Sequence, residues 1–134
     1  MATIGDVEGI DPKSATRLRK AGVRTTEGLI KVAASSKGRK ALAEKTGIAY
    51  ATLLGWVNRA DLMRVKGIGA EYADLLETAG CDTVKELRRR NPSNLTAAMV
   101  EVNEKKRLVR RLPTEAMVIA WVEQAKTMDS AVKY

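Results

Sequence analysis

The chain has 134 residues, of which 24 are Lys or Arg and 16 are Asp or Glu, so its formal net charge is +8. This length suits one ordinary domain or two very small ones, and the positive charge favours a polyanionic partner. A Cys/His zinc site is excluded because histidine is absent, and the single cysteine, Cys81, excludes an internal disulfide. No run of about 18 apolar residues is present and the first residues lack signal-peptide features, so we expect a cytoplasmic protein without a membrane partner.

Four helices are expected in the first half of the chain. Asp11-Pro12 is typical of a helix start, because Asp can cap free amides and Pro occupies a position that needs no donor. Gly22 suits a left-handed helix end. Caps and apolar spacing predict three more helices, over about residues 26–34, from Ser35 or Ser36 to Gly47, and over about residues 49–62.

Four helices are also expected in the second half. One follows Gly69 and ends at Gly80, and a shorter one covers about residues 83–90 before Asn91-Pro92 breaks it. The apolar spacing predicts two more, one marked by Leu95, Ala98, Met99 and Val102 and one over about residues 114–128. No segment alternates polar and apolar residues with period two, so we expect an all-α fold.

An internal repeat links the two halves. Residues 4–10 and 62–68 both read apolar-x-x-Val-x-Gly-Ile, at an offset of 58 residues, and further matches at this offset continue through the helices that follow. We therefore expect two helix-hairpin-helix-like pseudo-repeats, residues 1–60 and residues 61–134, packed as one compact helical unit.

Aromatic and sulfur side chains are expected in the core. Trp56 and Trp121 lie at equivalent repeat positions on apolar helix faces, which favours core packing over base stacking. Their offset is 65 residues, so the second copy carries a seven-residue insertion before its last helix. Cys81 is expected to behave as a small buried hydrophobe.

The segment Gly67-Ile68-Gly69 is a tight turn that opens directly into a helix. Outward-pointing amides and the positive end of the helix dipole at such a place provide a physical basis for holding a phosphate, with Ile68 anchored inward. Two carboxylates oppose this use. Asp11 stands where the first copy should have its second hairpin glycine, and Glu71 lies in the first turn of the second copy's helix.

Residues 65–80, which read V-K-G-I-G-A-E-Y-A-x-x-L-x-x-A-G, resemble the helix-hairpin-helix motif of DNA repair, recombination and replication proteins. The chain as a whole resembles an uncharacterised bacterial family, a domain of unknown function built from two copies of this kind. Proteins with the motif hold duplex or single-stranded DNA by its phosphate backbone through hairpin amides, without reading bases. The resemblance implies that mode of binding here.

We therefore expect a non-enzymatic nucleic-acid-binding protein that contacts the phosphates of DNA or RNA without sequence preference. The expected backbone donors are Gly67, Ile68, Gly69 and Ala70. The expected supporting charges are Lys66, Lys13, Arg17, Arg88, Arg89 and Arg90. Other interpretations stay open, because such hairpins also serve as plain connectors and the basic runs 88–90 and 105–111 also suit solvated helix faces.

Neither a catalytic constellation nor a metal site is apparent, and Gly67-x-Gly69 lacks the third glycine of a dinucleotide fingerprint. We expect no enzymatic activity, cofactor or small-molecule substrate. The alternative function, from another class, is a protein–protein interaction adaptor that uses the same scaffold structurally. It is motivated by the carboxylates that weaken both hairpins, and by Tyr72 and Leu75, which widen the apolar face of the helix in the second copy.

Overall fold

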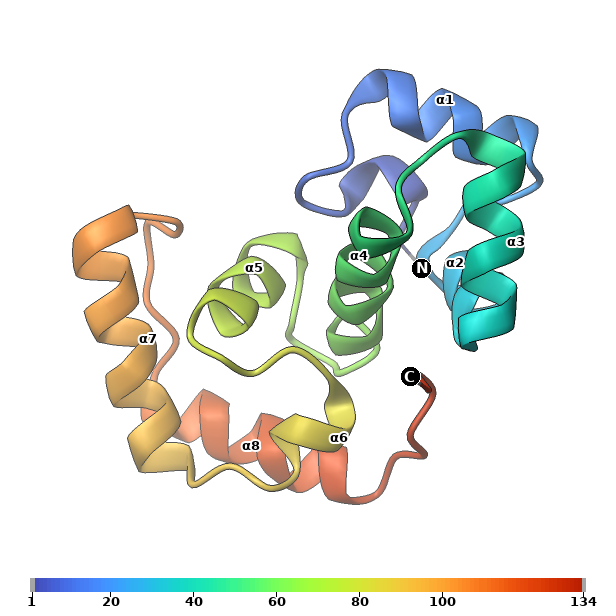
Figure 1. The fold of residues 1–134 in the computed structure, drawn as a ribbon. Coiled ribbons are helices and arrows are strands. Elements are labelled where there is room, and N and C mark those ends of the chain that lie inside the picture. Colours follow the sequence, from blue (N-terminus) through green and yellow to red (C-terminus); the bar gives the residue numbers. More distant parts are fainter. Residues whose placement is uncertain (1, 134) are drawn as a thin grey trace. The chain divides into compact units, whose positions relative to one another are not determined.

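The computed structural model describes residues 2–133 of the chain. Over that range it contains eight α-helices, one short 3-10 helix and no β-strand, which confirms the all-α prediction (Figure 1). Two compact units are present. The first unit comprises residues 2–61 and 131–133, and the second unit comprises residues 62–130.

The first unit begins with the 3-10 helix η1 and continues with helices close to their predicted ranges. The bounds are Ile4–Asp6 for η1, Pro12–Lys20 for α1, Thr26–Ala33 for α2, Ser36–Thr46 for α3 and Tyr50–Leu62 for α4. Helix α1 packs on η1, and α2 packs on α3. Ile4, Leu18, Leu29 and Leu53 have no exposed surface, since the apolar side chains recur at helical spacing and face the core.

Local capping explains where α2 and α3 begin and where α3 ends. The Thr25 hydroxyl accepts a hydrogen bond from the Gly28 amide at 3.0 Å, and the Ser35 hydroxyl accepts one from the Gly38 amide at 3.0 Å. Helix α3 is capped at its carboxyl end by Gly47, whose φ of +75° lies in the left-handed region that glycine adopts readily.

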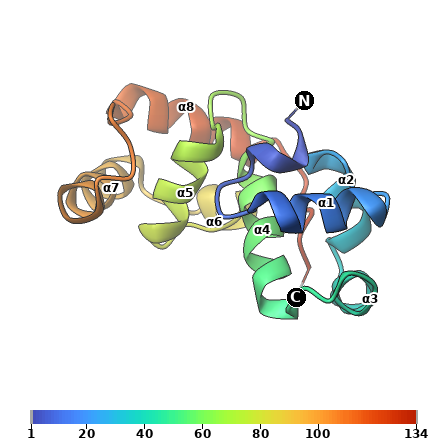
Figure 2. The ribbon, with the colours of Figure 1, turned by 90° about the horizontal axis from the view of Figure 1, so that it is seen from above.

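The second unit holds four helices around its own core. Their bounds are Ala70–Thr78 for α5, Val84–Leu87 for α6, Pro92–Lys106 for α7 and Glu115–Lys126 for α8. Helix α7 packs against α5 and α8, and α6 packs against α8 (Figure 1 and Figure 2). The core includes Leu75, Leu76 and Cys81, all fully buried, so the prediction for the cysteine is confirmed.

Helix α6 is shorter than the helix predicted over residues 83–90. After Leu87 the backbone tightens, and the Arg90 amide donates to the Leu87 carbonyl three residues earlier, at 3.1 Å. Pro92 follows and restricts the residue before it, so a regular helix cannot continue through this point.

Two turns in different parts of the chain share one backbone geometry. In the turn 7–10 and again in the turn 65–68, the last amide donates to the first carbonyl, at 3.2 Å and 3.1 Å. The glycine within each turn takes a left-handed φ, +94° at Gly9 and +96° at Gly67. This conformation strains any residue with a Cβ, so both turns require glycine.

A buried tryptophan lies against each of these glycines. The position that a Cβ would take at Gly9 is 3.4 Å from Nε1 of Trp56, and the corresponding position at Gly67 is 3.0 Å from Nε1 of Trp121. The two side chains are 6% and 3% exposed, which confirms the prediction of core packing. Each turn is therefore supported by a helix of its own unit.

Two glycines of the same hairpin should respond differently to substitution. Gly67→Ala places a Cβ at φ +96° and 3.0 Å from Trp121 Nε1, so the free energy of unfolding should fall by about 1–3 kcal/mol. Gly69 has a φ of −95° and no atom within 4 Å of its Cβ position, so Gly69→Ala should change stability by less than about 1 kcal/mol. Urea unfolding of both variants tests this, and equal losses would contradict it.

The thiol of Cys81 should be unreactive in the folded protein. Burial raises the pKa of Cys81 to about 12 from an ordinary value of 9.0, so the thiol is protonated near pH 8. A disulfide reagent should therefore label it slowly until urea unfolds the chain. The pKa of Cys81 is higher in the folded protein than in the unfolded chain. Its contribution to the free energy of unfolding is therefore complete below pH 9 and is lost as the pH rises towards 12. Equally fast labelling with and without urea would show the prediction to be wrong.

Candidate nucleic-acid interface

The hairpin of residues 66–70 immediately precedes α5 and contains the predicted phosphate site. Lys66, Gly67 and Gly69 are exposed, whereas Ile68 is only 4% exposed. The isoleucine thus anchors the turn in the core, as predicted, and the two glycines face outward on either side of it.

Two amides of the 66–70 hairpin have partners inside the second unit. The Ile68 amide donates to the Val65 carbonyl at 3.1 Å, and the Lys66 amide donates to Oε1 of Gln124 in α8 at 2.6 Å. Ile68 was predicted to be one of four backbone donors to phosphate, and the structure instead uses its amide to close the turn. The predicted donors that remain are Gly67, Gly69 and Ala70.

The start of α5 differs from that of most other helices. Side-chain oxygens cap the first turns of α2, α3, α6, α7 and α8 at 3.0–3.2 Å, from Thr25, Ser35, Thr83, Asn91 and Thr114. The capping residue of α5 is Gly69, and no side chain of the described residues caps this helix. Its first-turn amides are not satisfied within the helix, and space is open around Gly69. The positive end of the helix dipole adds to this arrangement, which suits an anion.

Charged groups of both signs surround this helix start. Lys66 and Glu71 are exposed on either side of it. The Tyr72 hydroxyl donates to the Arg111 carbonyl at 3.0 Å, which places the basic connection after α7 beside the first turn of α5. Arg111 was not among the predicted site residues. The basic run 105–111 was visible in the sequence. Its contact with Tyr72 was not, because no pattern near either residue indicates that the two lie close together.

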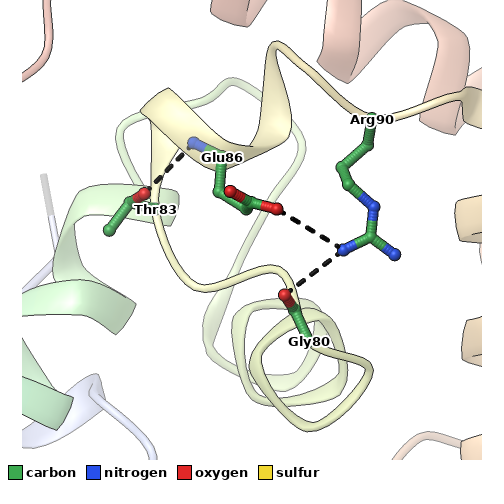
Figure 3. A network of polar contacts seen from close by, with 4 residues as sticks. All are labelled: Gly80, Thr83, Glu86 and Arg90. Carbon is green, nitrogen blue, oxygen red and sulfur yellow. Dashed lines mark hydrogen bonds and ion pairs between the residues drawn. The ribbon is translucent and has the colours of Figure 1, made fainter.

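Arg90, from the predicted basic run 88–90, is held at the other end of α5. Its Nη1 atom donates to the Gly80 carbonyl at 3.2 Å and lies 3.9 Å from Oε1 of Glu86 (Figure 3). Gly80 lies beyond the last residue of α5 and Gly69 precedes the first, and nine helical residues span about 14 Å. The structure therefore does not bring Arg90 to the 66–70 hairpin.

The other two arginines of the run differ from each other in accessibility. Arg88 donates from Nη2 to the Met128 carbonyl at 2.8 Å and to the Ser130 hydroxyl at 3.2 Å, so its guanidinium stabilises the segment after α8. Arg89 is exposed. Of the predicted run, only Arg89 combines exposure with a side chain that is not engaged in these contacts.

Lys13 and Arg17 belong to the first unit, where both are exposed on α1. The capping residue of this helix is Asp11, and its carboxylate makes no capping hydrogen bond, although we expected one from the sequence. The Ser14 side chain holds the pKa of Asp11 below its usual range, against a smaller opposing effect of burial, so the carboxyl is ionised at neutral pH. This charge opposes a phosphate at the position where the 66–70 hairpin has an open glycine.

Among the described residues, no helix combines the length and the apolar character needed to cross a membrane.

Comparison with known proteins identifies a family for this chain. Residues 8–128 match the family described as Domain of unknown function (DUF4332). Comparisons with curated proteins and with solved structures gave no significant match. The family match includes Gly9 and Gly67, the left-handed glycines of the two turns, and both buried tryptophans. The chain therefore belongs to the family described as Domain of unknown function (DUF4332).

Proposed function

We propose that this protein is a non-enzymatic nucleic-acid-binding protein that holds backbone phosphates without sequence preference, through hairpin amides and basic side chains. The observation that carries the proposal is the start of α5. It combines an open glycine, first-turn amides without a side-chain cap and the positive end of a helix dipole. In a chain of net charge +8, a phosphate of DNA or RNA is the anion that this position fits best.

We further propose that the chain is a tandem of helix-hairpin-helix-like pseudo-repeats. Support comes from local geometry that recurs at the predicted offset of 58 residues. The turns 7–10 and 65–68 have the same closing hydrogen bond and the same left-handed glycine, and each packs against a tryptophan. The helices after both turns end alike, with Gly22 at φ +89° and Gly80 at φ +95°.

The two hairpins are not equivalent as phosphate sites in this proposal. The second hairpin has Gly69 at the cap of α5, where a phosphate oxygen can approach the amides directly. The first hairpin has the ionised Asp11 at the same position, so Lys13 and Arg17 add to the general attraction for a polyanion without a hairpin contact. Binding is therefore concentrated in the 66–70 hairpin.

Lack of sequence preference follows from the kind of donor. Main-chain amides and exposed cations recognise phosphate oxygens, which are the same at every base step, and so position a nucleic acid without reading it. Glu71 weakens the attraction, since it lies in the first turn of α5. Lys66 before the turn and the basic connection that ends at Arg111 offset that charge.

A charge placed at the open glycine tests the site. Gly69→Glu should weaken binding of a labelled duplex about tenfold or more, because a carboxylate next to a phosphate adds repulsion and obstructs the amides. Ala97→Glu is the matched control, since it adds the same charge on an exposed face of α7. Fluorescence anisotropy at low salt measures both variants. No binding by the unmodified protein, or equal losses in the two variants, would refute the proposal.

The salt dependence tests whether phosphates are the ligand. Neutralising about three phosphates gives a slope of log K against log salt of roughly −2.7 on duplex DNA. Lys66→Gln should reduce the size of this slope by about 0.9. Titrations at several salt concentrations give the slope, and affinities that do not change with salt would contradict phosphate binding.

One of the two motives for the adaptor alternative, the apolar face of α5, is used within the second unit. Leu75 is fully buried in the core of the second unit, and the Tyr72 ring packs against Trp121 with ring centroids 5.4 Å apart. The apolar face that these residues were expected to offer a partner is therefore used inside the second unit. A protein partner is kept as the interpretation to pursue if the DNA and RNA titrations are negative.

A further inference from the structure

A buried arginine lies at the junction of α2 and α3. The Arg39 side chain has no exposed surface. Among residues 2–133, the groups that accept its hydrogen bonds are a hydroxyl and main-chain carbonyls, all uncharged. Nη1 donates to the carbonyls of Ala33 and Ala34 at 3.1 Å and 2.7 Å, where the carboxyl end of α2 carries partial negative charge. Nε donates to the Tyr50 hydroxyl at 3.2 Å.

The remaining nitrogen of this guanidinium is satisfied by the far end of the chain. Nη2 of Arg39 donates to the Lys133 carbonyl at 2.6 Å. The Lys133 amide in turn donates to the Ala34 carbonyl at 2.8 Å, so both main-chain groups of Lys133 are bound. Val132, just before it, is only 7% exposed. The segment 131–133 belongs to the first unit although it follows the second unit in the sequence.

These contacts recognise a peptide by its main chain. The Ala34 carbonyl at the end of α2 accepts from the N–H of Lys133. The buried guanidinium of Arg39 donates to the C=O of the same residue. The Lys133 side chain takes no part in either bond. One apolar side chain, that of Val132, is buried beside them. Such a site selects an extended segment in which an apolar residue precedes the residue whose N–H and C=O are both bound. Peptides that add a strand to a sheet edge are recognised through their main chain in a similar way.

We propose that the junction of α2 and α3 is a peptide-binding site and that its ligand is a segment of the same chain, residues 131–133. The segment is a releasable ligand in this proposal, because its contacts with the junction are the two main-chain bonds of Lys133 and the buried side chain of Val132. When it leaves, Nη2 of Arg39 exchanges the Lys133 carbonyl for water, and another segment of the same chemistry can restore the bond. This inference concerns the first unit and does not depend on nucleic-acid binding.

Release of the segment in the full chain provides the test. Val132→Asp places a carboxylate at the buried position and should free the site. A fluorescent peptide with the sequence of residues 128–134 should then bind the variant at least about tenfold more tightly than it binds the unmodified chain, whose own segment competes. Anisotropy titration measures both affinities. Equal affinities, or no binding to the variant, would overturn the proposal.

Changes in the peptide keep the test independent of protein folding. Methylation of the peptide nitrogen at the position of Lys133 removes the donor to Ala34, and replacing the valine by aspartate removes the apolar contact. Both peptides should lose binding to the Val132→Asp chain. In the unmodified chain, the Lys133 amide should exchange its hydrogen slowly in an NMR experiment. Binding by the methylated peptide, or exchange of this amide at the rate of an unfolded chain, would refute main-chain recognition.

Discussion

The left-handed glycine in the second hairpin is the constraint on which the candidate site depends. Gly67 turns the chain at φ +96°, and Trp121 lies so close that a Cβ would approach its Nε1 to 3.0 Å. The turn then places Ile68 in the core and Gly69 at the surface, at the start of α5. The buried Ile68 next to an open helix terminus holds the amide donors of this short loop on a rigid scaffold, where binding residues are commonly found. Stability and the proposed phosphate contact therefore arise from neighbouring residues with separate roles.

Arginine has a structural role at several places in this protein, so part of the positive charge is not available to bind a ligand. Arg39, Arg88 and Arg90 all donate to main-chain carbonyls at or beyond helix ends. A guanidinium suits such places because its several donors can satisfy carbonyls that a helix leaves unpaired. The formal net charge of +8 thus includes cations that hold the fold together. Exposed cations such as Lys66 and Arg89 are the ones that remain for a polyanion.

Local patterns predicted most of the secondary structure and the inward-facing side chains. Apolar spacing, capping residues and terminal glycines lie within one or two turns of the elements that they define, so the helices and the burial of Trp56 and Trp121 followed from the sequence. Contacts between distant segments could not be predicted in this way. The bond from Tyr72 to Arg111 and the docking of Lys133 beside Arg39 join residues far apart in the chain, and the sequence pattern of neither partner indicates the other. The shortened α6 also depends on context, since the sequence indicated the break at Asn91-Pro92 but not the tightening of the backbone after Leu87.

The proposed phosphate site is tested most directly by locating the ligand on the backbone. A titration of isotope-labelled protein with a short DNA duplex, followed by amide chemical shifts, reports each N–H separately. The amides of Gly67, Gly69 and Ala70 should shift the most, together with those of the first turn of α5, while amides of α2 and α7 stay unchanged. Shifts spread over other surfaces, or none at the start of α5 despite binding, would contradict the proposed site.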